Sequence, residues 1–251
     1  KLDANSRISL SNNDSGTDNT VFGFLAGAAL ASGGLENTIV GDYAATSLTT
    51  GDYNVALGSS AGVAITTGIK NVAVGASALL TEDTGYWNTA VGFEALKDMN
   101  YDGAGMNVAV GSYASANLST GTSNIAIGHL ALAAHTTGLR NIAIGVSAMD
   151  GTGANDCPTS IDNIFMGYDA GGGTWTTNDC NYNVGIGNYV MDAAMNGAVN
   201  NTAIGHQALS AVTTGYGNVA VGYQSGYALT TAAYNTLSGY QAGDSILMPQ
   251  S

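Results

Sequence analysis

The sequence is poor in charge, in proline and in cysteine, and each shortage excludes a class of protein. Asp, Glu, Lys and Arg make up 9% of the 251 residues, against about a quarter in ordinary soluble domains. The apolar share is nevertheless 45%, so the chain lacks the high charge and low hydrophobicity of a disordered polypeptide. Two prolines beside 36 glycines favour close-wound β-structure, which needs many positive φ angles and few missing hydrogen-bond donors.

Basic residues are also scarce. Five Lys and Arg against eighteen Asp and Glu give a net charge of −13, which repels phosphate backbones and anionic membrane surfaces. No nucleic acid partner is therefore expected. The longest apolar stretch, residues 21–31, is too short to cross a bilayer, so no membrane insertion is expected. The chain begins at Lys1 without a signal-like segment, which predicts a processed product or a piece of something longer.

Cysteine is limited to Cys157 and Cys180. Two thiols cannot provide the four ligands of a structural zinc site. In an extracellular protein they are expected to form one disulfide, and the alternative is two unrelated thiols. Neither a metal nor a cofactor is expected.

One short pattern repeats through most of the chain: Asn, a β-branched residue, a usually small apolar residue, a usually aliphatic residue and Gly. We call it the pentad. Its thirteen copies begin at Asn19, Asn37, Asn54, Asn71, Asn88, Asn107, Asn124, Asn141, Asn163, Asn183, Asn201, Asn218 and Asn235. Seven of the twelve intervals share one length, and the other five are slightly longer. So regular a period, of about 17 residues, predicts one structural coil per repeat.

Each part of the repeat predicts a local structure. The pentad at residues 71–75 alternates with period two and carries β-branched side chains, which predicts a strand of about five residues. Three residues after the glycine comes an alanine in eleven of the thirteen copies, as in Ala78, so a second short strand or a bend is expected there. Many coils end in Thr-Thr-Gly, as at residues 66–68, and this glycine is expected to mark the return turn.

Stacked coils are expected to share one core, because a single coil cannot bury its own apolar side chains. Neighbouring coils about 4.8 Å apart extend one sheet, so the predicted fold class is all-β, a parallel β-solenoid of about 13 coils with a repeat of about 17 residues. The asparagines are expected to form a side-chain ladder, to close local turns, or to do both. The ladder residues are Asn54, Asn71, Asn88, Asn124, Asn141, Asn201 and Asn218.

Both faces of the predicted strand are apolar. The second and fourth pentad residues, such as Val72 and Val74, share one face, and the third, such as Ala73, lies on the other. An isolated thin solenoid needs a polar outward face, whereas a strand that is covered on both sides is apolar throughout. The pattern therefore predicts that another copy of the chain covers some of this surface.

Three runs resemble the head repeats of YadA-like trimeric autotransporter adhesins and the related repeats of bacteriophage tail fibres. They are Asn88-Thr-Ala-Val-Gly-Phe-Glu-Ala-Leu96, Asn201-Thr-Ala-Ile-Gly-His-Gln-Ala-Leu209 and Asn218-Val-Ala-Val-Gly-Tyr-Gln-Ser-Gly226. The resemblance implies a left-handed β-roll, a side-by-side homotrimer and a role in surface attachment. The repeat is longer than in the adhesin heads, and no stalk, neck or membrane anchor follows, which favours the phage fibres.

The resemblance also suggests how the chain is organised. We expect a lead-in or cap at residues 1–18, a solenoid domain at 19–243 and a tail at 244–251. The solenoid carries insertions at 150–162 and 171–182. Insertions in a solenoid project as loops, and loops on rigid scaffolds often bind ligands, although harmless surface bulges are the alternative. The candidate receptor-contact residues in these loops are Asp156, Trp175, Asn178 and Asp179.

No catalytic residues are expected. His129 and His206 occupy the same repeat position four coils apart, which is about 20 Å at the usual strand spacing. They therefore share no metal or catalytic triad, and they are expected to lie on the surface. The carboxylates are scattered along the chain, and any sheet offers glycosidase-like pairs by accident.

Tyrosines gather near the end of the chain. They are expected either to stack on sugar rings or to fill space between coils or chains. The set comprises Tyr216, Tyr223, Tyr227, Tyr234 and Tyr240.

The sequence as a whole predicts a structural, adhesive and non-enzymatic fibre protein outside a cell, on a virion tail fibre or a bacterial surface. Its partners are expected to be copies of itself and a host-surface carbohydrate or protein. One alternative is an ice- or surface-binding solenoid that uses its paired threonines, although the pair is missing from the coils at Asn88, Asn141 and Asn183. Another alternative is a tailspike that cleaves polysaccharide.

Overall fold

The computed structural model describes residues 8–9, 18–151, 159–176 and 178–244. The chain forms two compact units, residues 1–123 and residues 124–251. Each unit is built of short strands joined by turns. No helix occurs among the described residues, so none of them forms a helix that could cross a membrane.

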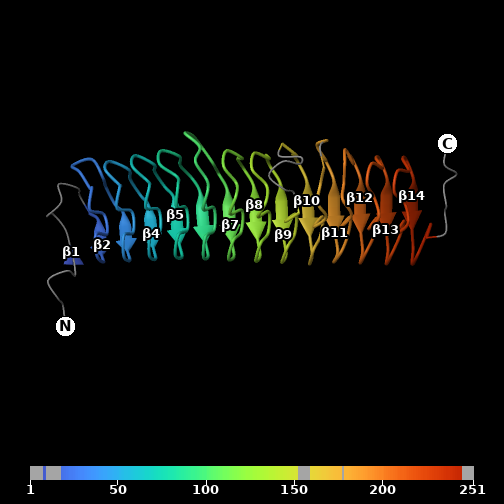
Figure 1. Cartoon of the computed structure of the whole chain (residues 1–251), viewed down its shortest axis with the longest axis horizontal. Coiled ribbons are helices and arrows are strands. Elements are labelled where there is room, and N and C mark those ends of the chain that lie inside the picture. The colour runs from blue at the N-terminus through green and yellow to red at the C-terminus, as the bar shows by residue number, and fades with distance from the viewer. Residues whose placement is uncertain (1–7, 10–17, 152–158, 177, 245–251) are drawn as a thin grey trace. The chain divides into compact units, whose positions relative to one another are not determined.

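Every pentad contributes one strand of three residues, and one further strand, of two residues, comes before the first pentad. In unit 1 the strands are β1 (Ile8–Ser9), β2 (Thr20–Phe22), β3 (Thr38–Val40), β4 (Val55–Leu57), β5 (Val72–Val74), β6 (Thr89–Val91) and β7 (Val108–Val110). In unit 2 they are β8 (Ile125–Ile127), β9 (Ile142–Ile144), β10 (Ile164–Met166), β11 (Val184–Ile186), β12 (Thr202–Ile204), β13 (Val219–Val221) and β14 (Thr236–Ser238). Within each unit the arrows lie side by side in chain order (Figure 1).

The strands of successive coils pair in parallel and in register. Val72 of β5 lies opposite Thr89 of β6, and Ala73 lies opposite Ala90. The same register holds where coils are longer, since Phe165 of β10 lies opposite Ala143 of β9 although the intervening coil has five extra residues. The predicted parallel β-solenoid, with a spacing of about 17 residues between coils, is therefore confirmed.

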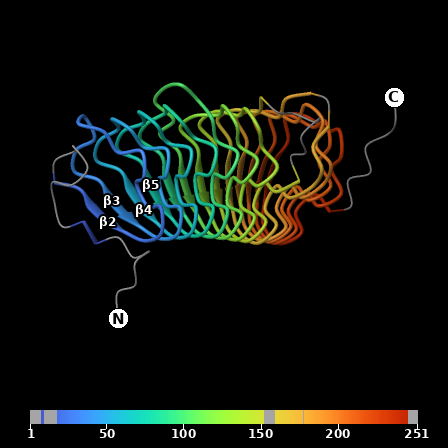
Figure 2. The ribbon, with the colours of Figure 1, turned by 60° about the vertical axis from the view of Figure 1, so that its left-hand side comes forward.

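Hydrogen bonds between coils also run around the turns. The backbone nitrogen of Ser77 donates to the carbonyl of Ser59 in the preceding coil at 2.9 Å, and that of Leu79 donates to Ala95 in the following coil at 2.9 Å. Figure 2 shows the turns that join β2 to β5 following one another at similar positions. Neighbouring coils are thus joined by backbone hydrogen bonds at their turns as well as at their strands.

The strand is shorter than predicted, because the two ends of the pentad have other roles. Asn71 accepts a hydrogen bond from the next coil with its side chain, and Gly75 turns the corner with φ at 132°. A Cβ atom on Gly75 would collide with the carbonyl of Gly92 in the next coil, so glycine is required there. The alanine position that follows, as at Ala78, lies in a turn and not in a second strand.

Three further positions in a coil have left-handed backbone without requiring glycine. In the coil that starts at Asn71 these are Ser77, Leu79 and Trp87, with φ at 56°, 51° and 65°. Non-glycine residues seldom adopt this conformation. Its recurrence at equivalent positions indicates that the stacked hydrogen bonds offset the local cost.

The core runs through the middle of each unit. The third pentad residue points inward, as do the alanine after the glycine and an aliphatic residue farther along the coil. In the coil at Asn37 these three are Ile39, Ala44 and Leu48, and all are fully buried. Narrow coils of this size leave room for only one layer of side chains, which explains why the inner strand position is usually alanine.

Candidate functional site

The recurring asparagines lie inside the coils and bond from coil to coil. Asn71 Oδ1 accepts the backbone N–H of Asn88 at 3.0 Å, and Asn54 Oδ1 accepts that of Asn71 at 3.0 Å. Asn71 Nδ2 donates to the carbonyl of Gly85, the glycine that closes its own coil, at 2.8 Å. One side chain therefore serves both as a ladder rung and as a turn closure.

Two further predicted ladder residues behave alike. Asn124 accepts from Asn141 at 2.9 Å and donates to Gly138 at 2.8 Å. Asn201 accepts from Asn218 at 3.0 Å and donates to Gly215 at 2.8 Å. All of these asparagines are buried, so the ladder stabilises the fold and does not face a ligand.

Asn88 departs from this pattern. Its Nδ2 is buried and has no hydrogen-bond partner among the described residues. The interval from Asn88 to Asn107 is 19 residues, longer than the common interval. The buried Glu82 lies in the preceding coil, at the position that holds Leu48 and Ile65 in their coils. Its carboxylate accepts the N–H of Gly85 at 2.7 Å, and burial raises the pKa of Glu82 to about 7.

The second and fourth pentad residues point outward and form what we call the strand face. Leu57, Ile127 and Ile204 are examples of exposed aliphatic side chains on it, and Ile204 is 40% exposed. None of the thirteen pentads carries Asp, Glu, Lys or Arg at these two positions. Each unit therefore presents an uncharged apolar strip that follows its strands.

The two residues after each pentad glycine form a corner beside the strand face. In unit 2 this corner carries a row of five rings from successive coils. The centroid distances are 5.3 Å for Tyr168–Tyr189, 5.9 Å for Tyr189–His206, 5.5 Å for His206–Tyr223 and 5.1 Å for Tyr223–Tyr240. We call this set the ring row.

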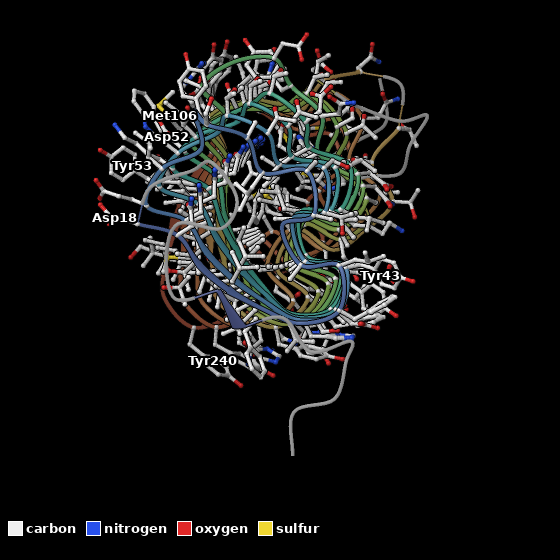
Figure 3. The ribbon with its side chains drawn as sticks, turned by 90° about the vertical axis from the view of Figure 1, so that its left-hand side faces the viewer. Asp18, Tyr43, Asp52, Tyr53, Met106 and Tyr240 are labelled. Carbon is white, nitrogen blue, oxygen red and sulfur yellow. The ribbon has the colours of Figure 1, made fainter. Side chains whose placement is uncertain are left out.

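The rings of the row have two orientations. Tyr223 lies nearly parallel to both His206 and Tyr240, with interplanar angles of 12° and 11°. Tyr189 is turned by 67° to Tyr168 and by 71° to His206. The side chain of Tyr240 projects away from the ribbon (Figure 3), and it is 74% exposed. In unit 1 the corner carries ring pairs such as Phe24–Tyr43 at 5.4 Å.

A ladder of glutamines runs beside the ring row. Gln224 Nε2 donates to Gln207 Oε1 at 2.8 Å, and Gln241 Nε2 donates to Gln224 Oε1 at 2.9 Å. These residues directly follow His206, Tyr223 and Tyr240. Sequence reasoning missed both rows as continuous features, although counting positions from each pentad glycine would have found the glutamines, which all stand two residues after it.

The tyrosine set that the sequence singled out is divided between two places. Tyr223 and Tyr240 belong to the ring row, whereas Tyr216 and Tyr234 form a separate edge-to-face pair at 5.1 Å just before the pentads. In unit 1 the equivalent edge before the pentads carries Asp18, Asp52, Tyr53 and Met106, whose side chains point to the same side in Figure 3.

The paired threonines are engaged in the stack. Thr49 Oγ1 lies 3.0 Å from the carbonyl oxygen of Thr66, and Thr66 Oγ1 lies 3.2 Å from that of Asp83. Thr213 repeats the contact with Thr230 at 3.2 Å. The first hydroxyl of these pairs is thus directed at the next coil, which weakens the case for a threonine array that binds ice.

Trp175 is not a surface residue, contrary to its selection as a receptor contact. It is 0% exposed and lies edge-on to Phe165 with centroids 5.7 Å apart. Phe165 occupies the inner strand position that usually holds alanine, and Gly171 and Gly185 make room for its ring. The longer coil widens the interior here, and the two large side chains fill it.

The other residues selected from the two insertions differ in exposure. Asn178 and Asp179 are exposed, and Asp179 accepts a hydrogen bond from Thr159 Oγ1 at 2.6 Å. Cys180 is buried, with its sulfur 3.6 Å from the carbonyl of Asn178. Asp156 and Cys157 lie outside the described residues, so the disulfide and the contact role of Asp156 stay predictions.

The histidines divide into two kinds. His129 and His206 are exposed, in the position predicted for them. His135 is fully buried where other coils carry Leu48 or Ile65, and its Nε2 lies 3.2 Å from the carbonyl of Ser160. Burial lowers the pKa of His135 to about 4, so the imidazole is neutral at physiological pH.

Acidic residues cluster in successive coils of unit 2. The pKa of Asp169 is raised, first by burial and then by the charges of Asp150 and Asp192. Across the described part of the chain, no group of three or more His, Cys, Asp or Glu side chains is placed to hold a metal ion.

The chain matches none of the protein-family models, curated proteins or solved structures with which it was compared. The resemblance to adhesin and tail-fibre repeats therefore stays a prediction from the sequence.

Proposed function

We propose that this chain is a structural and adhesive fibre protein that assembles side by side with copies of itself as a homotrimer. Its place is the shaft or head of a phage tail fibre or a cell-surface adhesin, outside the cell, and it is not an enzyme. The strand face is the observation that carries this proposal. It is uncharged, mostly apolar, and exposed or half-buried in successive coils of each unit.

An exposed apolar strip of this kind favours association. Soluble monomers seldom leave large contiguous apolar patches in water, and such patches mark interaction sites. A second copy of the chain offers a strip of the same length and spacing, so the two match at every coil. The net charge of −13 opposes contact elsewhere on the surface, which leaves the uncharged strand face as the preferred contact.

The interior supports a mechanical role. The described core is filled mainly by aliphatic side chains, alanine above all, and by asparagines that bond between coils. Hydrogen bonds between coils on several sides of the stack suit a unit that must resist force along its stacking direction.

The mass of the native particle tests the proposal, because a closed assembly of identical chains has one defined mass. Light scattering of the purified protein should show a single species with three times the mass of the 25.1 kDa chain. A stable monomer at micromolar concentration would contradict the proposal.

A pair of variants in one coil tests whether the strand face is the interface between copies of the chain. Ile204→Glu places a charge on the strand face, where three copies would bury it, and burying unpaired charge is costly. We expect this variant to dissociate while its circular dichroism stays native. Thr214→Glu, at an exposed turn of the same coil, is the control and should remain trimeric. Equal behaviour of the two variants would rule out the strand face as the interface.

A further inference from the structure

The ring row and the glutamine ladder form one surface with a uniform chemistry. In the four coils that start at Asn183, Asn201, Asn218 and Asn235, the two corner positions hold only Asn, Gln, His and Tyr. No formal negative charge lies among them, although the chain as a whole carries −13. An uncharged surface on such an acidic protein offers no attraction to a cationic partner or an anionic one.

The glutamines keep hydrogen-bonding capacity for a ligand. An amide has two N–H donors and an oxygen with two lone pairs, and each ladder bond uses one donor and one lone pair. Gln224, in the middle of the ladder, donates to Gln207 and accepts from Gln241. It therefore retains one donor and one acceptor that the ladder does not use.

The aromatic side chains stay accessible despite their mutual contacts. Tyr223 is 41% exposed, and Tyr240 is more exposed still. Tyrosine combines a rigid apolar ring with a polar hydroxyl, and together with amides it recognises polar surfaces at a low cost in conformational entropy. Because the ladders already fix these side chains, little further freedom is lost on binding.

We propose that the corner of unit 2 from Asn188 to Gln241 is a binding surface for a neutral polysaccharide that lies along the stack. A polysaccharide offers apolar C–H faces for the rings and hydroxyl groups for the amides, without net charge. Its repeating units match a surface whose rings recur at 5.1 to 5.9 Å from coil to coil. This inference deepens the proposed function, because attachment requires a receptor, and it rests on that function only for its biological role.

Affinity electrophoresis of the full chain tests the inference. The protein migrates through gels that contain a neutral β-glucan, a neutral α-mannan or a neutral galactan, and through gels that contain a polyuronate or no polymer. We expect at least one neutral polysaccharide to retard the chain and the polyuronate to leave it unretarded. Retardation by none of the neutral polymers, or by the polyuronate alone, would overturn the proposal.

Matched variants locate the binding surface. Tyr223→Ser with Tyr240→Ser removes two rings of the row, and serine already occupies this position at Ser59 and Ser112, so the fold is expected to tolerate it. We expect binding to weaken about tenfold or more, a loss of the size measured for aromatic contacts. Phe24→Ser with Phe93→Ser removes two rings at the same position in unit 1 and should change nothing. An equal loss in both double variants, or in neither, would contradict the proposal.

The native mass of the same samples separates the two hypotheses. A monomer that still binds a neutral polysaccharide through the ring row would refute the trimer and leave the binding surface intact. A trimer that no neutral polysaccharide retards in the gel would refute the binding surface and leave the proposed trimer intact.

Discussion

The backbone nitrogen of Asn163 donates to Oδ1 of Asn141 at 3.1 Å, although 22 residues separate the two asparagines. Asn71 and Asn88 make the same bond at 3.0 Å across 17 residues. The register of neighbouring coils is therefore fixed by the pentads and not by the length of chain between them. Longer loops cost little extra entropy once their ends are held, which explains how the stack accepts insertions.

Removing a ladder asparagine should destabilise the chain. Asn201→Ala leaves the N–H of Asn218 and the carbonyl of Gly215 without their partners, and each unsatisfied buried group costs about 1–3 kcal/mol. We expect the free energy of unfolding, measured in urea, to fall by about 2–4 kcal/mol. Gln224→Ala, which interrupts the glutamine ladder at the surface, should cost less than about 1 kcal/mol. Equal losses would mean that burial of the asparagine does not matter.

Alanine substitutions at two pentad glycines distinguish the cost of backbone strain from the cost of a steric collision. Gly222 and Gly239 have φ at 136° and 127°, so alanine is strained at both, by about 1–3 kcal/mol. A Cβ on Gly222 would also strike the carbonyl of Gly239, whereas no described atom lies within 4 Å of a Cβ on Gly239. Gly222→Ala should therefore lower the thermal midpoint much more than Gly239→Ala. Similar midpoints would show that φ alone requires glycine.

Substitutions of the two tryptophans test whether Trp175 is buried. Trp175→Ala opens a cavity beside Phe165, and replacing a buried tryptophan by alanine costs about 3–5 kcal/mol. Trp87 is 47% exposed, so Trp87→Ala should cost far less. Urea unfolding of the two variants compares them directly. A small loss for Trp175→Ala would indicate that its side chain lies at the surface after all.

Glu82 and His135 should give opposite dependences of stability on pH. Burial raises the pKa of Glu82 from 4.5 to about 7, so its contribution is fully present below pH 4.5 and is lost as pH rises to about 7. Burial lowers the pKa of His135 from 6.5 to about 4. Its contribution is fully present above pH 6.5 and is lost as pH falls towards 4.

Single variants isolate the two titrations. Glu82→Gln should remove the decline in stability between pH 4.5 and 7. His135→Leu should remove the rise in stability between pH 4 and 6.5. The substitution leaves no unpaired carbonyl at Ser160, because that carbonyl still accepts a hydrogen bond from Asn141 Nδ2 at 2.9 Å. Thermal midpoints measured from pH 4 to 8 check both outcomes. A variant with the pH profile of the unaltered chain would exclude its residue as the source.

The sequence predicted the solenoid because its signal is repeated in every coil. The pattern of asparagine, a β-branched residue and glycine recurs at a regular spacing, and such a repeat predicts stacked strands. It did not settle which face of the strand is inside, since valine and alanine are both apolar. The structure places the third pentad residue inside, which is alanine in most coils, such as Ala56 in the coil of Ile65, but isoleucine at Ile39 in the coil of Leu48.

The functional residues were harder to predict. Trp175 looked like a binding residue because it interrupts the period, but an enlarged coil also needs larger core side chains. The ring row escaped notice because Tyr189 lies one position later in its coil than Tyr223, and only the stacking shows that the two belong together. Left-handed backbone at Leu79 has no signal in its own residue, although other coils carry glycine at the equivalent position, as at Gly62 and Gly226.

Strand β1 has a consequence for how copies of unit 1 can meet. Ile8 and Ser9 pair antiparallel with Phe22 and Val21 of β2, in the opposite direction to every other described strand pair of the unit. An open edge of β2 would present unpaired amides and carbonyls to any foreign strand. With β1 seated there, end-to-end polymerisation into amyloid-like filaments through that edge is blocked.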